Sequence, residues 1–284
     1  MRIAGGLVVG LVTLLWCGLA SGAAGSAIAD AAMKGDSAAV AALLKQKADV
    51  NAQQADGATA LHWAVYHDDV ALIDRLVTAG ARVTVANRHG ATPLALACIN
   101  GSARAIERLL KAGADPNERG PNGETALMMA SRTGAVDAML VLLKAGAEIN
   151  ATEKLRGTTA LMWAAAQSHA PAVKALIEHG ANVGVRSSPA ALGRTAYLAP
   201  TARQRASQLV NEADRESFVR RPANEGGGLT ALVFAAREGD MESARLLVAA
   251  GADVNQATQY GWTALLAATH NRHYTLATFL LEHG

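Results

Sequence analysis

The sequence predicts an all-α fold, an α-solenoid of about seven helix-turn-helix units with one long insertion. The first observation is the spacing of serine and threonine residues that can open a helix, which lie 33, 33, 33, 34, 71 and 33 residues apart. The second is that glycines able to end the second helix of a unit keep the same period. Such a period is typical of arrays whose units pack only on their neighbours. The helix-opening residues are Ser26, Thr59, Thr92, Thr125, Thr159, Thr230 and Thr263, and the glycines are Gly80, Gly113, Gly146, Gly180, Gly251 and Gly284.

The first helix of a unit is clearest in the stretch that follows residue 122. Asn122-Gly123 is a turn dipeptide, and the hydroxyl of Thr125 can accept an N–H group of the first helical turn. Glycine can take the left-handed conformation that commonly ends a helix. We therefore predict a helix over 126–133 that ends at Gly134.

The second helix of the same unit is predicted from an apolar stripe. Val136, Leu140 and Leu143 recur at i, i+4 and i+7, and Met139 and Leu142 widen the stripe. Isolated helices of about eight to ten residues are marginal in water. The apolar stripes must therefore be covered by neighbouring units, which predicts a continuous stack.

Three segments resemble the signatures of ankyrin repeats. Gly57-Ala58-Thr59-Ala60-Leu61-His62 and Gly90-Ala91-Thr92-Pro93-Leu94 are similar to G-x-T-P-L-H, and Gly251-Ala252-Asp253-Val254-Asn255 is similar to G-A-D-V-N. The resemblance runs from Ser26 to the C-terminus, apart from the insertion, and implies an ankyrin-repeat α-solenoid. The proline of the signature is present only as Pro93 and its histidine only as His62. We therefore expect fewer hydrogen bonds between neighbouring turns.

The chain is expected to divide into four parts. Residues 1–23 form a secretory signal peptide, because Arg2 precedes an apolar run and Ser21-Gly22-Ala23 offers a small-residue cleavage site. An uncleaved membrane anchor is the alternative. Cleavage would leave one cysteine, Cys98, which we expect to be buried and free. Residues 24–184 are a cap unit and four repeats, 185–224 a basic insertion loop, and 225–284 two further repeats, which we expect to be truncated at the C-terminus.

The insertion is the most basic part of the chain. Residues 185–224 carry seven arginines and three carboxylates, whereas the formal net charge of the chain is only +2. We expect a mobile loop with a short helix over 202–217. A solvated linker, an eroded repeat that begins near Gly193, and a basic flap that contacts an acidic partner or lipid head groups are the alternatives.

No residue pattern in the sequence indicates catalysis or cofactor binding. There is no glycine-rich phosphate loop, no His-Glu-x-x-His and no Cys-x-x-Cys. His270 and His273 could share a helix face, but two ligands are too few for a closed zinc site. We therefore predict that the protein is not an enzyme and has no catalytic, cofactor-binding or metal-binding residue. The small net charge does not favour nucleic acid as a partner.

The resemblance to ankyrin repeats implies that a protein partner is bound by the turn tips and by the first helices along the concave face. Residues in this register differ from unit to unit, and tyrosine, tryptophan and arginine supply much of the energy at interfaces. Trp63, Trp163 and Phe234 share one register. They are expected either to form an exposed aromatic row or to pack between neighbouring units. The predicted partner-binding residues are Tyr66, His67, Arg88, His89, Asn100, Asn122, Arg132, Arg156, Gln167, Arg237, Tyr260, Trp262 and His270.

These observations predict a periplasmic or secreted scaffold, monomeric and without membrane insertion after cleavage, that binds a protein and does no chemistry. Three alternatives remain open: an accessory or protective subunit of an exported enzyme, the binding region of a longer protein with a catalytic domain beyond residue 284, and a membrane-tethered receptor.

Overall fold

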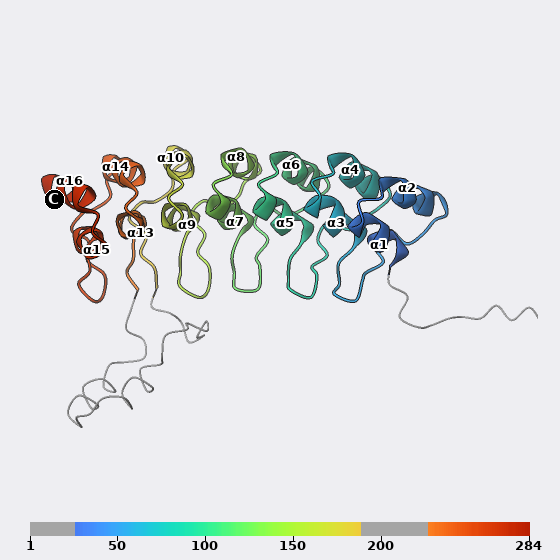
Figure 1. The fold of residues 1–284 in the computed structure, drawn as a ribbon, viewed down its shortest axis with the longest axis horizontal. Coiled ribbons are helices and arrows are strands. Elements are labelled where there is room, and N and C mark those ends of the chain that lie inside the picture. Colours follow the sequence, from blue (N-terminus) through green and yellow to red (C-terminus); the bar gives the residue numbers. More distant parts are fainter. Residues whose placement is uncertain (1–25, 189–226) are drawn as a thin grey trace, which may run out of the picture.

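The protein is a row of stacked helix pairs, as a computed structural model shows (Figure 1). The structure describes residues 26–188 and 227–284. Each pair is one unit, with an inner helix first and an outer helix second. Within the described residues, the inner helices of units 1 to 7 are α1 (Ala27–Met33), α3 (Ala60–Tyr66), α5 (Pro93–Asn100), α7 (Ala126–Thr133), α9 (Ala160–Ala166), α13 (Ala231–Glu238) and α15 (Ala264–His270). Their outer helices are α2 (Ser37–Lys45), α4 (Val70–Thr78), α6 (Ala103–Lys111), α8 (Val136–Lys144), α10 (Ala170–Glu178), α14 (Met241–Ala249) and α16 (Tyr274–Glu282).

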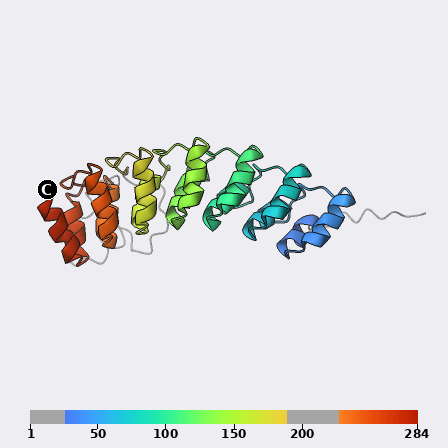
Figure 2. The same ribbon diagram turned by 90° about the horizontal axis from the view of Figure 1, so that it is seen from above.

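This arrangement confirms the predicted all-α solenoid. The inner helices form one row, the outer helices a second row, and the units follow an arched path (Figure 2). A turn segment, which we call a finger, projects beside each inner helix from α3 to α15 and carries the number of its unit. Fingers 2 to 7 are residues 51–59, 84–92, 117–125, 150–159, 184–188 with 227–230, and 255–263.

Within the described residues, no helix combines the length and the apolar character that a membrane span requires.

The predicted helix-opening residues begin the inner helices. Thr125 is the N-cap of α7, and its hydroxyl accepts the N–H of Met128. The hydroxyls of Ser26 and Thr159 accept in the same way from Ala29 and Met162. Each hydroxyl satisfies an N–H group that has no partner inside its helix. The predicted limits of α7, 126–133, are confirmed.

The predicted phase of the stripe on α8 is wrong at one position. Leu140 is 37% exposed, whereas Met139 and Leu142 are fully buried together with Ala138. The helix VDAMLVLLK has apolar residues around most of its circumference, so several stripes fit the sequence equally well. The buried face of α8 includes the small Ala138, and its methyl group allows a neighbouring helix to approach closely.

The stack continues on both sides of the segment that is not described. The inner helix α9 packs against α13, and the outer helix α10 packs against α14. Finger 6 is closed by a hydrogen bond from the N–H of Ser187 to the carbonyl of Leu229, 2.9 Å. An equivalent bond, from Glu153 N–H to Thr158 O at 3.1 Å, closes finger 5. Residues 185–188 therefore belong to the finger. The predicted signal peptide and the predicted helix over 202–217 lie outside the described residues.

Cys98 is buried in α5, as predicted, and is free. Burial raises the pKa of its thiol far above the ordinary value, and the nearby carboxylate of Glu118 adds to this. The thiol therefore stays protonated and packs as a small apolar group.

Candidate protein-binding surface

Neighbouring fingers are joined by a ladder of backbone hydrogen bonds. In each step, one N–H group donates to a carbonyl of the preceding finger. Arg88 N–H donates to Asp56 O at 2.8 Å. The later steps run from Lys154 N–H to Asn122 O at 2.8 Å, from Ser188 N–H to Arg156 O at 2.7 Å and from Gln259 N–H to Gly227 O at 3.4 Å. The ladder holds the finger tips in register and makes them one side of a continuous surface.

One step of this ladder cannot form. Pro121 takes the register position of Arg88 and Lys154, and proline has no N–H group to donate. The proline ring instead packs closely on Gly90, where an added Cβ would lie 2.5 Å from Pro121 Cγ. Fingers 3 and 4 are therefore joined by van der Waals contact at this point.

Two of the predicted binding residues also hold the array together. The imidazole Nε2 of His67 lies 2.9 Å from the carbonyl of Met33, at the end of the preceding inner helix. The side-chain amide of Asn100 donates to the carbonyl of Val65 at 2.9 Å. Because both bonds satisfy carbonyls at helix C-termini, His67 and Asn100 serve the junctions between units, although both residues are exposed.

The structure does not bring the predicted residues to a single place. In unit 2, Tyr66 is 60% exposed and its ring lies edge-on to Trp63 at 5.7 Å. In unit 7, the rings of Trp262 and His270 meet edge-on at 5.2 Å, and Tyr260 is exposed beside them. These two groups lie near opposite ends of the described array (Figure 1).

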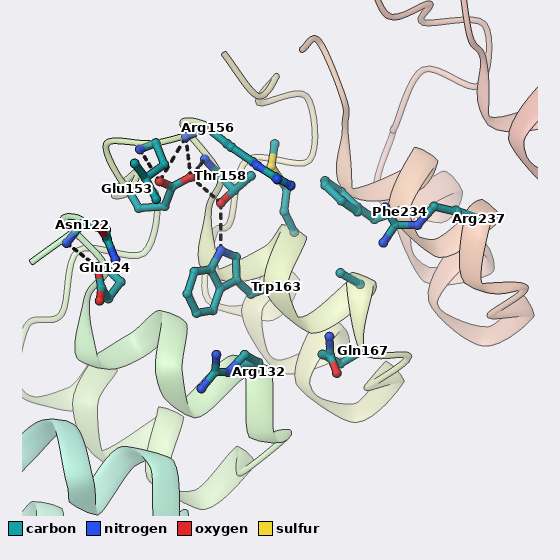
Figure 3. Close-up of a pocket in the computed structure, with 13 residues that line it drawn as sticks. Asn122, Glu124, Arg132, Glu153, Arg156, Thr158, Trp163, Gln167, Phe234 and Arg237 are labelled. Atoms are coloured by element: carbon teal, nitrogen blue, oxygen red, sulfur yellow. Dashed lines mark hydrogen bonds between the residues drawn. The ribbon is translucent and has the colours of Figure 1, made fainter. Parts of the chain in front are cut away.

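A third group converges in the middle. The predicted residues of units 4, 5 and 6 line a cavity of about 460 Å³ between the fingers and the inner helices, which we call the central cavity (Figure 3). A smaller cavity of about 150 Å³, which His89 lines, adjoins it and shares Glu124, Arg132 and Trp163. Arg88 is exposed on finger 3. The central cavity is lined by Asn122, Glu124, Arg132, Glu153, Leu155, Arg156, Thr158, Met162, Trp163, Ala166, Gln167, Phe234 and Arg237.

One wall of the central cavity is built around the carboxylate of Glu153. It accepts hydrogen bonds from the N–H groups of Leu155, Arg156 and Thr158 and from the Thr158 hydroxyl. The same hydroxyl accepts the indole N–H of Trp163 at 2.8 Å (Figure 3). Burial alone would raise the pKa of Glu153, but these hydrogen bonds outweigh burial and lower it. The ionised carboxylate thus holds the backbone of finger 5 in place, and the Thr158 hydroxyl links this finger to Trp163 of α9.

The sequence-based prediction missed this wall. Glu153, Leu155 and Thr158 were not among the predicted site residues, although all three line the cavity. The signal that could have revealed them is the step of 34 residues from Thr125 to Thr159, in place of 33. The additional residue lengthens finger 5 and makes room for the loop that closes around the carboxylate.

Two arginines of the central cavity lie over aromatic rings. Arg132 Cζ is 5.6 Å from the centre of the Trp163 ring, and Arg237 Cζ is 5.0 Å from that of Phe234. Such cation–π contacts orient the guanidinium group. The Arg132 guanidinium forms no ion pair within the described residues and keeps its edge available to a ligand, whereas Arg237 is paired with Glu238 at 2.7 Å. Trp163 and Phe234 therefore serve the cavity, whereas Trp63 contacts Tyr66 in unit 2.

The two histidines considered for metal binding have separate partners. His270 contacts the ring of Trp262, and His273 Nε2 lies 3.2 Å from the carbonyl of Arg237. Across residues 26–188 and 227–284, no group of three or more histidine, cysteine or acidic side chains is arranged to hold a metal ion.

Comparison with known proteins identifies the repeat. A family model described as "Ankyrin repeats (3 copies)" matches residues 28–120, 106–187 and 202–284. No curated protein matches the chain. The ankyrin repeat domain of human ASB11 is 26% identical with a TM-score of 0.68, and covers 90% of this chain and 97% of its own. The ankyrin repeat domain of Bcl-3, a member of the IkappaB family, is 25% identical with a TM-score of 0.65, and covers 89% and 97%. Since the family model matches most of its length, the chain belongs to the ankyrin-repeat family.

Proposed function

We propose that the protein is a non-catalytic scaffold that binds a protein partner through the inner helices of the concave face and the finger tips. Ankyrin repeats generally mediate protein–protein interaction. The export, the surface used and the absence of catalysis are our proposals for this chain.

The observation that carries the proposal is a contrast between two registers of the inner helix. One register is occupied by alanine, 0% exposed, in each of units 2 to 7. Two residues later, the side chains lie at the concave face and change from unit to unit. Alanine is retained where helices pack closely, whereas the concave face is free to vary and to match a partner. The alanines are Ala64, Ala97, Ala130, Ala164, Ala235 and Ala268, and the varying residues are Tyr66, Ile99, Arg132, Ala166, Arg237 and His270.

The test is capture of partners by the full chain and by two triple variants. Arg132→Ala, Gln167→Ala and Arg237→Ala alter the central cavity, and all three residues are exposed. The matched control alters Arg104, Lys144 and Lys174 to alanine, which are exposed on the outer helices α6, α8 and α10. We expect partners to be retained by the wild type and the control and lost by the first variant. Equal capture by all three proteins would contradict the proposed surface.

We also propose that the scaffold acts after export, in the periplasm or outside the cell, as a monomer and without binding nucleic acid. The support is the apolar N-terminal run after Arg2 and the small residues that end at Ala23. N-terminal sequencing of the protein from the exported fraction should find Ala24 as the first residue. A retained Met1 would favour the membrane-tethered alternative.

A further inference from the structure

We infer that the central cavity recognises an extended acidic segment of the partner, in which a carboxylate side chain stands next to an apolar or aromatic one. This inference rests on the proposed function and specifies the chemistry of the partner. It follows from the charges, from the apolar floor and from the way the cavity carboxylates are used.

Two of the positive charges of the cavity are available to a ligand, whereas the third, Arg237, is paired with Glu238 at 2.7 Å. Arg132 and Arg156 are exposed on two sides of the cavity, and neither forms an ion pair with any residue that the structure describes. Arg132 is held in place by the ring of Trp163. An arginine fixed by stacking keeps its N–H edge free for a carboxylate, which it binds with two parallel hydrogen bonds.

The negative charges of the cavity are committed to the fingers. The carboxylate of Glu153 accepts three backbone N–H groups and a hydroxyl, and the residue is only 7% exposed. Glu124 accepts the backbone N–H of Asn122 at 2.9 Å. Neither carboxylate neutralises Arg132 or Arg156, so an incoming carboxylate would find partners at both arginines.

The floor between the arginines is apolar. It is formed by Met162 and Phe234, which are 1% and 8% exposed, by the half-buried Leu155 and by the ring of Trp163. A volume of about 460 Å³ lies within the range of about 300–1,000 Å³ typical of ligand pockets. One apolar side chain can enter this space while a neighbouring carboxylate reaches the rim. The side-chain amide of Gln167 has no hydrogen bond within the described residues and lines the cavity, where it can bind the backbone of the segment (Figure 3).

The same arrangement disfavours a nucleic acid. A chain of phosphates would be repelled by Glu124 and by the ionised Glu153, because both carboxylates line the same cavity as the arginines. Binding of nucleic acid usually relies on many cationic contacts along the backbone. Here the two unpaired arginines, Arg132 and Arg156, come singly from two neighbouring units, which suits one or two isolated carboxylates.

The experiment is a selection of ligands on the immobilised full chain from a random ten-residue peptide library displayed on phage. We expect enriched peptides to carry aspartate or glutamate within two residues of phenylalanine, tryptophan or leucine. The most enriched peptide, labelled with fluorescein, should bind Arg132→Ala and Arg156→Ala at least ten-fold more weakly than the wild type. Arg104→Ala, an exposed arginine of α6 far from the cavity, should bind as the wild type does.

The outcomes separate this inference from the proposed function. If uncharged or basic peptides are enriched and lose affinity in Trp163→Ala, the cavity binds proteins but the acidic partner is wrong. If a labelled ten-nucleotide thymidine oligonucleotide binds as tightly as the peptide and depends on the same arginines, the cavity is a phosphate site and the inference fails. If no peptide is retained, or if the arginine variants bind normally, both the inference and this location of the binding surface fail.

Discussion

The buried seam between the inner and outer helices differs from the concave face in how residues recur. In the seam, alanine and leucine return in each unit, as at Ala130 and Leu142, and these side chains are fully buried. On the concave face, tyrosine, isoleucine, arginine, alanine and histidine occupy one register in turn. The comparison teaches that the free energy of folding is concentrated in one layer, so that the other layer can diverge at little cost in stability.

The largest effect should separate two leucines of the same helix. Leu142→Ala removes a fully buried side chain and should lower the free energy of unfolding by about 2–5 kcal/mol. Leu140→Ala acts on a residue that is 37% exposed and should cost less than about 1 kcal/mol. Urea unfolding followed by circular dichroism measures both values. Equal losses would refute the division into seam and surface on α8.

A smaller effect should separate two glycines with similar backbone angles. Gly90 and Gly80 have φ of +76° and +90°, so alanine is strained at either position. At Gly90 the added Cβ would also lie 2.5 Å from the Pro121 ring, whereas at Gly80 nothing lies within 4 Å. We expect Gly90→Ala to cost about 1–3 kcal/mol and Gly80→Ala about 1 kcal/mol. If Gly80→Ala cost more than Gly90→Ala, the fingers would be able to move apart and relieve the clash between the added Cβ and the Pro121 ring.

His62, the histidine of the Gly57–His62 repeat signature, is buried and makes the stability of the fold depend on pH. Burial lowers the pKa of His62 below 6.5, although hydrogen bonds with the Ala91 carbonyl oppose this shift. The unfolded chain therefore binds a proton more readily than the folded chain, and stability should fall as the pH drops below about 6.5. Thermal midpoints between pH 7.5 and 5.5 should decrease for the wild type and decrease less for His62→Gln. Parallel decreases in the two proteins would assign the effect to other groups.

Glu118 should give stability the opposite dependence on pH. Burial raises its pKa above 4.5, with a hydrogen bond from the Thr92 hydroxyl acting against the shift. The folded chain therefore holds this proton more tightly, and its contribution to stability is lost as the pH rises through the raised pKa. Glu118→Gln should remove this loss, which denaturant midpoints measured from pH 4 to 7 would reveal.

The smallest effect on stability is expected on the concave face. Arg132→Ala removes the guanidinium group that lies over Trp163 and should cost about 0.5–1 kcal/mol. The same substitution should strongly weaken partner capture. A large loss of stability would show that the concave face contributes to the fold as much as the seam does.

The fold could be predicted because its determinants are local and repeated. Thr125 caps a helix and Gly134 ends it through contacts within a few residues. A serine or threonine N-cap recurs in the other described units, and glycine also ends α5 and α13. The phase of α8 could not be predicted, because leucines and valines surround the helix and the buried face includes the small Ala138. Alanine is inconspicuous in a search for large apolar residues.

The candidate site was predicted only in part. The residues of the central cavity that belong to the repeat register, such as Arg132 and Gln167, follow from that register alone. The carboxylate of Glu153 is held by backbone N–H groups of its own finger, and these partners depend on the folded backbone rather than on residue type. The bonds of His67 and Asn100 to preceding units are equally invisible in sequence, since their partners are carbonyl groups that every residue carries.

The closed base of finger 6 has a consequence for the evolution of this chain. The bond between Ser187 and Leu229, and the bonds of Ser188 and Gly227 to neighbouring fingers, complete the finger whatever chain lies between them. The packing of the repeat array thus does not depend on the length of that intervening segment. Such a position is a natural point of growth, at which sequence can be gained, lost or exchanged between species, or grafted by an engineer, while the periodicity of the remaining units is inherited unchanged.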